Sequence, residues 1–173
     1  YPFFRRLGIL LPLLALYFGS YFGLGQFNLH RRYYYDVSLR IDSMIPFIPV
    51  LIYPYLLVIA LVAILYVAAP DLPALKKAAK AILALALICF AIFALVPVKA
   101  MHRPLVIADG SLTNELVLFF YWLDAPVNLF PSMHVGMSFL VAWICGSFNR
   151  VLGIVCRILA TAVAVSVLLV KQH

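Results

Sequence analysis

The sequence predicts an all-α protein: a polytopic bundle of transmembrane helices with about five spans, accompanied by helices that lie at the membrane interface. Two features of the composition lead to this fold class. The 173 residues are 66% hydrophobic, and their mean hydropathy is +1.10. Only 11% are charged, well below the roughly 25% of an ordinary soluble domain. A chain this apolar cannot cover a water-facing surface, which excludes a soluble globular enzyme, a disordered tail and a disulfide scaffold.

Five apolar runs approach the length of about 20 residues that a transmembrane helix needs. They are residues 7–24, 45–69, 78–98, 132–147 and 152–170. The last two are separated only by residues 148–151, which include Asn149 and Arg150, so we expect a helical hairpin. Two longer connections, residues 25–44 and 103–130, are rich in aromatic side chains and resemble segments at the membrane interface.

These runs belong to a single integral-membrane domain that we expect to cover residues 1–173. The chain begins at Tyr1 without a methionine and stops at His173, immediately after an apolar run. We therefore expect it to be truncated at both ends relative to the complete protein.

The net charge of +7 indicates topology rather than a nucleic-acid partner, because the 13 Lys and Arg residues are scattered between apolar runs and form no stripe. With five spans, one membrane face receives Arg5, Arg6, Lys76, Lys77, Lys80, Arg150 and Arg157, with Asp71 as its one acid. The other face receives Arg31, Arg32, Arg40, Lys99, Arg103 and Lys171, with five acids. We place the first face in the cytoplasm, because its basic residues lie in short, acid-poor connections.

The second, non-cytoplasmic face also collects the polar residues that are unusual in such a chain. These are Lys99, Arg103, Ser132, His134, Lys171 and His173. In a hairpin, the start of the first helix and the end of the second lie at the same face. At 1.5 Å per residue, His134 lies about 20 Å from Ser147 and His173 about 28 Å from Ile154. The two histidines are therefore expected at similar depth.

These residue types suit a phosphate site. Pro131 fits the first position of a helix, whose free backbone N–H groups favour anions, and Ser132 adds a hydroxyl donor. Arg103 offers a planar fork of donors, and Lys99 and Lys171 offer point charges. Two histidines can divide phosphoryl transfer, since one can attack phosphorus while the other, protonated, donates to the leaving oxygen. Cations and a helix end can stabilise the charge that magnesium stabilises elsewhere, so we expect no metal and no cofactor.

Each residue also has a plain structural interpretation. A histidine at a helix end is usually interfacial, Lys171 can extend to the headgroups, and Arg103 can bind headgroups without specificity. The conjunction of three such clusters at one face favours function, because ionisable groups at membrane depth are costly. His30 and His102 lack this setting. The four histidines show neither HxxxH nor HExxH spacing, which argues against a metal site.

Three segments resemble the motifs of the type 2 phosphatidic acid phosphatase superfamily, a group of membrane-embedded, metal-independent lipid phosphatases and phosphotransferases. They are Arg-Pro at residues 103–104, Pro-Ser-Met-His at residues 131–134, and the stretch from Ser166 to Lys-Gln-His at residues 171–173. The segment Ile-Pro-Phe-Ile-Pro at residues 45–49 is similar to the branch that contains inositol phosphorylceramide synthases. The resemblance implies that His173 is the nucleophile, His134 the general acid, and Arg103 and Ser132 phosphate ligands.

The chain departs from the family pattern at several positions. Val96 stands where the first motif has a lysine, so Lys99 is the candidate substitute, and Met133 stands where the second motif usually has glycine. In the third motif Val167 replaces an arginine, a charge that Lys171 can supply. The family also has an orienting Asp four residues beyond the second histidine and a sixth span, and the sequence reaches only to His173.

We therefore expect a lipid phosphatase that hydrolyses a phosphomonoester through a phosphohistidine, with a membrane lipid phosphate as substrate and the bilayer as its surroundings. One alternative is a head-group phosphotransferase similar to the synthase branch. Another is a non-catalytic protein that binds or translocates anionic lipids with the same pocket. Phosphatases and transferases share the chemistry and differ in the acceptor.

Overall fold

The computed structural model describes residues 2–99, 103–104, 106, 109–124 and 126–171. Within these ranges the regular elements are all helical, which confirms the predicted all-α class. The helices are α1 (Pro2–Leu29), α2 (Ile52–Tyr55), α3 (Leu57–Ala68), α4 (Leu72–Leu95), α5 (Leu112–Leu123), α6 (Met133–Phe148) and α7 (Arg150–Leu169), with short 3-10 helices η1 (Arg40–Ser43) and η2 (Pro49–Leu51).

Polar residues determine where four of the helices begin. Asp71, Ser111, Ser132 and Asn149 are the N-caps of α4, α5, α6 and α7, and each side chain accepts a hydrogen bond from the backbone N–H three residues later. Such caps satisfy N–H groups that the first helical turn leaves unpaired. Asn149 is the single residue between α6 and α7. The predicted hairpin is therefore confirmed, with a shorter turn than the expected residues 148–151.

The second predicted span is one apolar segment but not one regular helix. It begins at Pro49 rather than at residue 45, and η2, α2 and α3 together form a span of 20 residues, Pro49–Ala68. The regular pattern breaks at Leu56, two residues after Pro54, as expected where proline cannot donate to the helical ladder. Residues 45–48 are outside the helix, and the backbone N–H of Ile48 donates to the carbonyl of Leu169 at 2.9 Å.

Among the described residues, four helical segments are long and apolar enough to cross a membrane, and they indicate an integral membrane protein. They are Phe4–Leu29, Pro49–Ala68, Leu72–Leu95 and Arg150–Leu169. The predicted run at residues 132–147 corresponds to α6, which has 16 residues and a length of about 24 Å at 1.5 Å per residue. This is shorter than the roughly 30 Å hydrocarbon core, so α6 does not meet the same length criterion.

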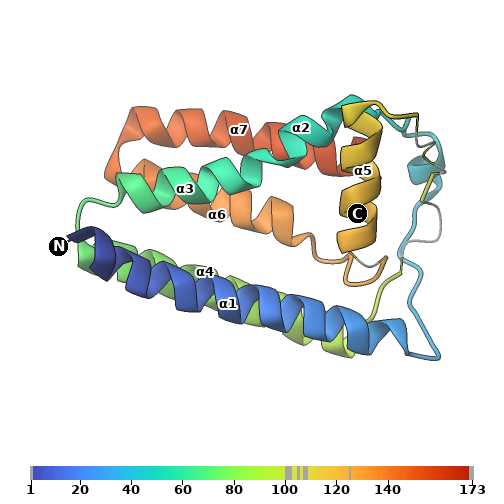
Figure 1. Ribbon diagram of the computed structural model, residues 1–173, viewed down its shortest axis with the longest axis horizontal. Coiled ribbons are helices and arrows are strands. Elements are labelled where there is room, and N and C mark those ends of the chain that lie inside the picture. The colour runs from blue at the N-terminus through green and yellow to red at the C-terminus, as the bar shows by residue number, and fades with distance from the viewer. Residues whose placement is uncertain (1, 100–102, 105, 107–108, 125, 172–173) are drawn as a thin grey trace.

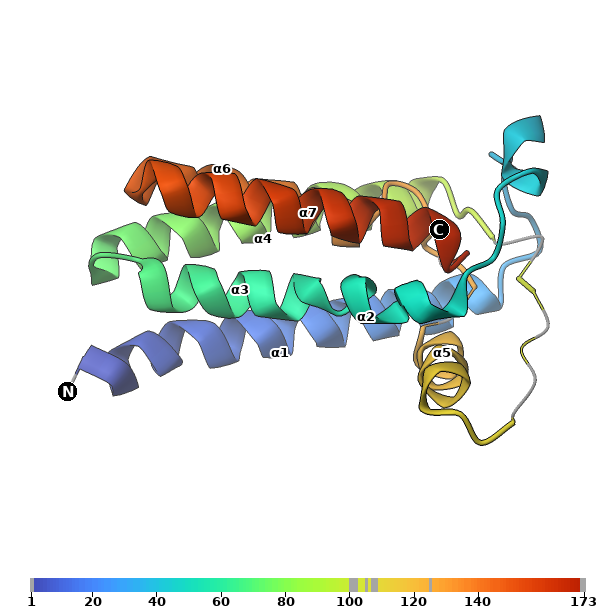
Figure 2. The ribbon, with the colours of Figure 1, turned by 90° about the horizontal axis from the view of Figure 1, so that it is seen from above.

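The long helices run side by side along the bundle, and α5 lies crosswise at one end of it (Figures 1 and 2). Within the predicted interfacial stretch of residues 103–130, residues 112–123 form a helix, α5, and its location at a membrane interface stays a prediction. The other predicted interfacial stretch, residues 25–44, is partly wrong, because residues 25–29 continue α1 as a transmembrane helix. The N-terminal end of the chain and the short α3–α4 and α6–α7 connections lie at the opposite end of the bundle (Figure 1).

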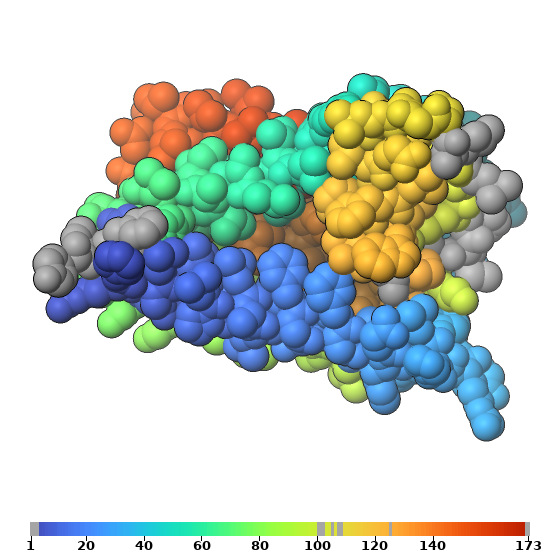
Figure 3. All heavy atoms as spheres, in the orientation of Figure 1, coloured from blue at the N-terminus to red at the C-terminus, as the bar shows by residue number. Residues whose placement is uncertain are grey.

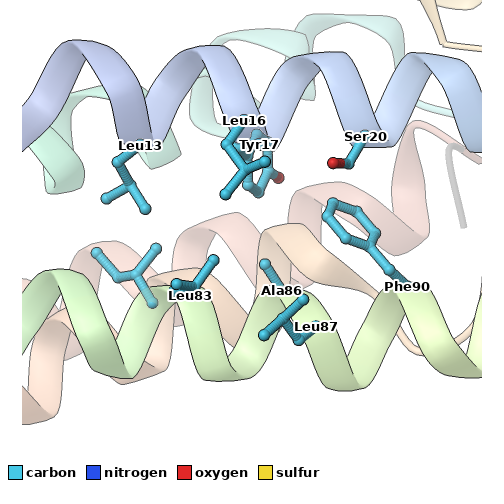
Figure 4. A pocket seen from close by; sticks show the side chains of 9 residues that line it. Leu13, Leu16, Tyr17, Ser20, Leu83, Ala86, Leu87 and Phe90 are labelled. Atoms are coloured by element: carbon cyan, nitrogen blue, oxygen red, sulfur yellow. The ribbon is translucent and has the colours of Figure 1, made fainter.

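Two apolar clusters hold the bundle together. The larger joins α2, α3, α6 and α7, and the smaller joins the C-terminal half of α4 to Met133 and to partly buried side chains of α1. Helix α1 packs mainly against α4. Leu13 and Tyr17 of α1 face Leu83 and Ala86 of α4 across a small gap of about 50 Å³ (Figure 4). The α1–α4 pair is therefore less tightly packed than the α6–α7 hairpin.

Two glycines allow α6 and α7 to approach each other closely. A Cβ atom built on Gly153 would lie 2.3 Å from the Cα of Gly146 and 2.9 Å from its backbone N. A Cβ built on Gly146 would lie 3.6 Å from the Cα of Gly153, which is an ordinary contact. Small residues at helix crossings are typical of membrane proteins. Gly153 is therefore the position at which the hairpin requires glycine.

We expect Gly153→Ala to destabilise the protein by about 1–3 kcal/mol, the usual range for overpacking, because the added methyl group must push α6 away from α7. Gly146→Ala is the matched control and should melt close to the wild type. The measurement is thermal unfolding of the purified protein in detergent. Equal melting temperatures for the two variants would contradict this account of the hairpin.

Candidate active site

The predicted site residues that the structure describes lie where several distant segments of the chain meet at one end of the bundle. The start of α6, the end of α7 and the crosswise helix α5 are all found at this end (Figures 1 and 2). Arg103 and Lys99 belong to the connection that leads from α4 to α5. Lys99 and Arg103 therefore lie at the same end of the bundle as the start of α6 and the end of α7, as the alternation of the spans predicts.

Arg103 lies against the C-terminal end of α5. Its Nη1 donates to the carbonyls of Tyr121 at 3.1 Å and Asp124 at 2.9 Å, and its Cζ lies 4.7 Å from the centre of the Tyr121 ring. The other two nitrogens, Nε and Nη2, are buried and have no hydrogen-bond partner among the described residues. A buried donor without a partner is costly. Nη1 of the guanidinium therefore binds the protein, and the N–H groups of Nε and Nη2 are suited to binding an anion.

Burial lowers the pKa of the Arg103 guanidinium from its usual value, and the nearby charge of Asp124 opposes that shift. Arginine stays protonated in proteins even when its pKa is lowered. The site therefore keeps one fixed positive charge in surroundings with little water. Such surroundings strengthen its attraction for a phosphate oxygen.

The end of α7 is held by two contacts with other segments. The hydroxyl of Tyr121 donates to the carbonyl of Val170 at 2.6 Å, and Nζ of Lys171 donates to the carbonyl of Asp42 at 2.5 Å. Lys171 has a positive φ of 56°, so the chain turns sharply where α7 ends. His173, the predicted nucleophile, lies outside the described residues. Its role remains a prediction, while the helix that leads to it ends beside α5.

The start of α6 differs from the expected geometry in one respect. Pro131 is not the first helical residue: the helix begins at Met133 and Ser132 is its N-cap, preceded by a cis peptide bond between Phe130 and Pro131. The Ser132 hydroxyl accepts from the backbone N–H of Val135 at 3.4 Å. This hydroxyl therefore caps the helix and can still donate its own proton.

His134 lies in the first turn of α6 with its ring close to an aromatic partner. The centres of the His134 and Tyr55 rings are 4.4 Å apart, with 30° between the ring planes. Tyr55 is itself buried, with 1% of its surface exposed, and its ring also meets that of Phe120 from α5. Packing between α2, α5 and α6 thus fixes the position of the histidine that is predicted to be the general acid.

Lys99 lies farther along the same end of the bundle. Its Nζ is 5.0 Å from the centre of the Tyr34 ring, and its backbone pairs with Val127. Its predicted role as a phosphate ligand stays a prediction. His102 lies outside the described residues. His30 is exposed and its ring interacts with the carbonyl of Gln26.

Asp124 and Tyr21 were not among the predicted site residues. Asp124 is the C-cap of α5 and is 7% exposed, and its Oδ1 accepts a hydrogen bond of 2.5 Å from the hydroxyl of Tyr21 in α1. In the sequence, Asp124 appears as one more acid in a connection, and Tyr21 as one aromatic residue in an apolar run. The only available signal was the position of Asp124 directly after the aromatic segment of residues 119–123.

A cavity of about 660 Å³ lies between α1 and α3 and reaches this end of the bundle. Its volume falls within the range of small-molecule sites. Figure 3 shows the hollow between α1 and α3, with atoms of α6 at its floor. Most of its lining is aliphatic or aromatic, and Tyr21, Tyr55, Asp124 and His134 contribute polar groups. The cavity therefore offers one long apolar chamber with a carboxylate and an imidazole in its wall.

Comparison of the chain with protein-family models, with curated proteins and with solved structures finds no match.

We expect Arg103→Lys to weaken the binding of inorganic phosphate or orthovanadate about tenfold, because lysine keeps the charge but loses the planar fork of donors. Arg32→Lys is the control, since Arg32 is an exposed arginine at the same end of the bundle. Anion affinity can be measured from the shift in melting temperature with increasing ligand. Equal affinities for the two variants would show that Arg103 does not bind the anion.

Proposed function

We propose that this protein is a membrane-embedded, metal-independent lipid phosphatase that resembles the type 2 phosphatidic acid phosphatases. The observation that carries the proposal is Arg103, whose buried Nε and Nη2 have no hydrogen-bond partner among the described residues and lie at the end of the bundle where α6 begins, with His134 in its first turn. An unpaired guanidinium edge suits two phosphate oxygens. The apolar cavity beside His134 suits the hydrocarbon part of a lipid.

In the proposed reaction, a ring nitrogen of His173 attacks the phosphorus of a lipid phosphomonoester. The bond from phosphorus to the lipid oxygen breaks, and protonated His134 donates its proton to that oxygen, which releases the lipid alcohol. Water then attacks the phosphohistidine and transfers a proton to His134, and inorganic phosphate leaves. Arg103 and the Ser132 hydroxyl bind the oxygens that carry the charge. The assignment of His173 depends on the family resemblance alone.

We further propose that α6 is a fifth membrane crossing, shortened because its N-terminal end lies below the headgroup level. Its close packing against α7, α3 and α4 supports this placement. His134 would then act within the membrane, where ionisable residues indicate function. The basic residues at the opposite end lie in short, acid-poor connections, which supports a non-cytoplasmic location for this end.

A head-group phosphotransferase is the second candidate. It is favoured by the Ile-Pro-Phe-Ile-Pro segment, because Ile48 of this segment donates to the carbonyl of Leu169 and so lies against the end of α7. Both reactions begin with attack of the histidine on phosphorus, but in the transfer the phosphorus keeps its head group until the hydroxyl of a second lipid displaces the histidine. Release of inorganic phosphate without an added acceptor supports the phosphatase. Product formation that depends on a second lipid supports the transferase.

We expect His134→Ala and His173→Ala each to reduce phosphate release from a lipid phosphate by at least about 10²-fold, because each removes a group from the proton-transfer or nucleophilic step. The assay uses the full-length protein in detergent or nanodiscs and measures inorganic phosphate.

His30→Ala is the matched control, as it removes an exposed histidine from the same end of the bundle. It should leave turnover near that of the wild type. Melting temperatures confirm that each variant is folded. Turnover close to wild type in His134→Ala would remove the general-acid assignment.

A further inference from the structure

The end of α7 is held by a hydrogen bond from another helix. Val170 directly follows the last residue of α7 and is fully buried, and its carbonyl accepts from the Tyr121 hydroxyl at 2.6 Å. The last carbonyls of a helix have no partner within it, and a buried carbonyl that loses its donor is costly. Burial of Val170 keeps bulk water from supplying that donor, and Tyr121 supplies it instead.

The same residue also contacts Arg103. The centre of the Tyr121 ring lies 4.7 Å from Cζ of Arg103, and the Tyr121 carbonyl accepts from Nη1 at 3.1 Å. A cation over an aromatic ring is attracted to it. Tyr121 reaches both partners because α5 lies crosswise at the end of the bundle, so that its last turn comes beside the end of α7 (Figures 1 and 2). One residue thus joins the anion-binding guanidinium to the end of α7.

The Tyr121 hydroxyl keeps its proton, as a donor to a carbonyl must. Burial raises the pKa of this hydroxyl to about 12, although the positive charge of Arg103 acts in the opposite direction. The flanking residues Phe120 and Trp122 have no hydroxyl. In this part of α5, Tyr121 is therefore the residue whose side chain can both lie against a guanidinium and donate to a carbonyl.

The backbone turns immediately after Val170. Lys171 has a φ of 56°, in the left-handed region that is unfavourable for residues other than glycine. Its Nζ donates to the carbonyl of Asp42 at 2.5 Å. An unfavourable conformation persists where the surrounding contacts determine it. The direction in which the chain leaves α7 is therefore set by contacts with other segments, and the hydrogen bond from Tyr121 is one of them.

We propose that Tyr121 is a positioning residue that holds the end of α7 at a fixed place relative to the anion on Arg103. The importance of this placement rests on the proposed function, in which α7 leads to the nucleophile His173. Displacement of a reacting group by about 1 Å costs about 10²-fold in rate. The hydroxyl of Tyr121 fixes the end of the helix that leads to the attacking group, and its ring and carbonyl fix the side chain that binds phosphate.

Two substitutions separate these contacts in the full-length protein in nanodiscs. Tyr121→Phe keeps the ring beside Arg103 and removes the donor to Val170, whereas Tyr121→Leu removes both. In Tyr121→Phe we expect kcat for phosphate release from a lipid phosphate to fall about tenfold or more, with the affinity for inorganic phosphate close to that of the wild type. In Tyr121→Leu both should fall. Tyr33→Phe is the matched control, since it removes an exposed hydroxyl from the connection after α1, and it should keep both.

Hydrogen–deuterium exchange gives a second measurement that does not depend on turnover. The backbone N–H groups of Val170 and Lys171 donate to the carbonyls of Ser166 and Leu168. Their exchange should be about tenfold faster in Tyr121→Phe, the effect of one hydrogen bond. Exchange at the start of α7 should stay as in the wild type, which shows that the variant is folded.

Three results would overturn the proposal. Unchanged exchange at the end of α7 in Tyr121→Phe would show that the hydroxyl does not hold that end. Faster exchange with the kcat of an active wild type would show that the contact is structural support only. A wild type that binds no phosphate would leave no anion for Tyr121 to position against.

Failure of the proposed reaction gives a different pattern. If the wild type binds inorganic phosphate but releases none from lipid phosphates, the proposed phosphatase fails. Faster exchange at the end of α7 in Tyr121→Phe, with unchanged phosphate affinity, would then still support the positioning role. If the wild type is active and Tyr121→Phe equals it in kcat, the reaction stands and the positioning role fails.

Discussion

Helix ends inside an apolar bundle present carbonyl groups that need donors, and arginine side chains provide those donors here. Arg6 donates to the carbonyls of Tyr66 and Ala69 at the end of α3, at 2.9 and 2.7 Å. Arg31 donates to the carbonyl of Ala94 at the end of α4 at 2.5 Å, and Arg103 binds the end of α5. The last carbonyls of a helix have no partners within it, and a cation there also interacts favourably with the helix dipole. Each of these contacts joins segments that are distant in the sequence.

These contacts explain how α1 can stand away from α3 and leave a cavity. Arg6 ties the first part of α1 to the end of α3, while Arg31 and Asn28 tie the last part to the end of α4. About two-thirds of the way along α1, Tyr21 donates a hydrogen bond to Asp124 at the end of α5. A helix held at these separate points does not need to pack along its full length against α3. The hollow is therefore compatible with a stable bundle, because the polar contacts and the α1–α4 packing hold α1 in place.

Local sequence patterns predicted much of the fold. Contacts between residues distant in the sequence account for most of the differences between the predicted and the observed elements. The α6–α7 hairpin could be predicted because Asn149 is both a turn residue and an N-cap. The end of α1 could not be predicted in this way, because Gln26 and Asn28 resemble the start of a polar connection. Asn28 is in fact fully buried, and its side-chain amide donates to the carbonyl of Phe93 and to Asn128. A polar residue that finds its partners 65 and 100 positions later gives no local signal.

In the candidate site, too, some residues could be predicted from the sequence, and others depend on contacts between distant segments. Arg103, Ser132 and His134 could be placed at one end because alternating spans determine which connections share a membrane face. Asp124 and Tyr21 could not be assigned, because the cavity that they line depends on where α1 lies.

Short connections close the opposite end of the bundle, whereas the site end is formed by long segments that each require an anchor. Arg103 is such an anchor for α5, and two of its nitrogens, Nε and Nη2, have no hydrogen-bond partner among the described residues. One side chain therefore connects the stability of this end to its capacity to bind an anion. A substitution at Arg103 must consequently be interpreted with a measurement of folding beside the measurement of binding.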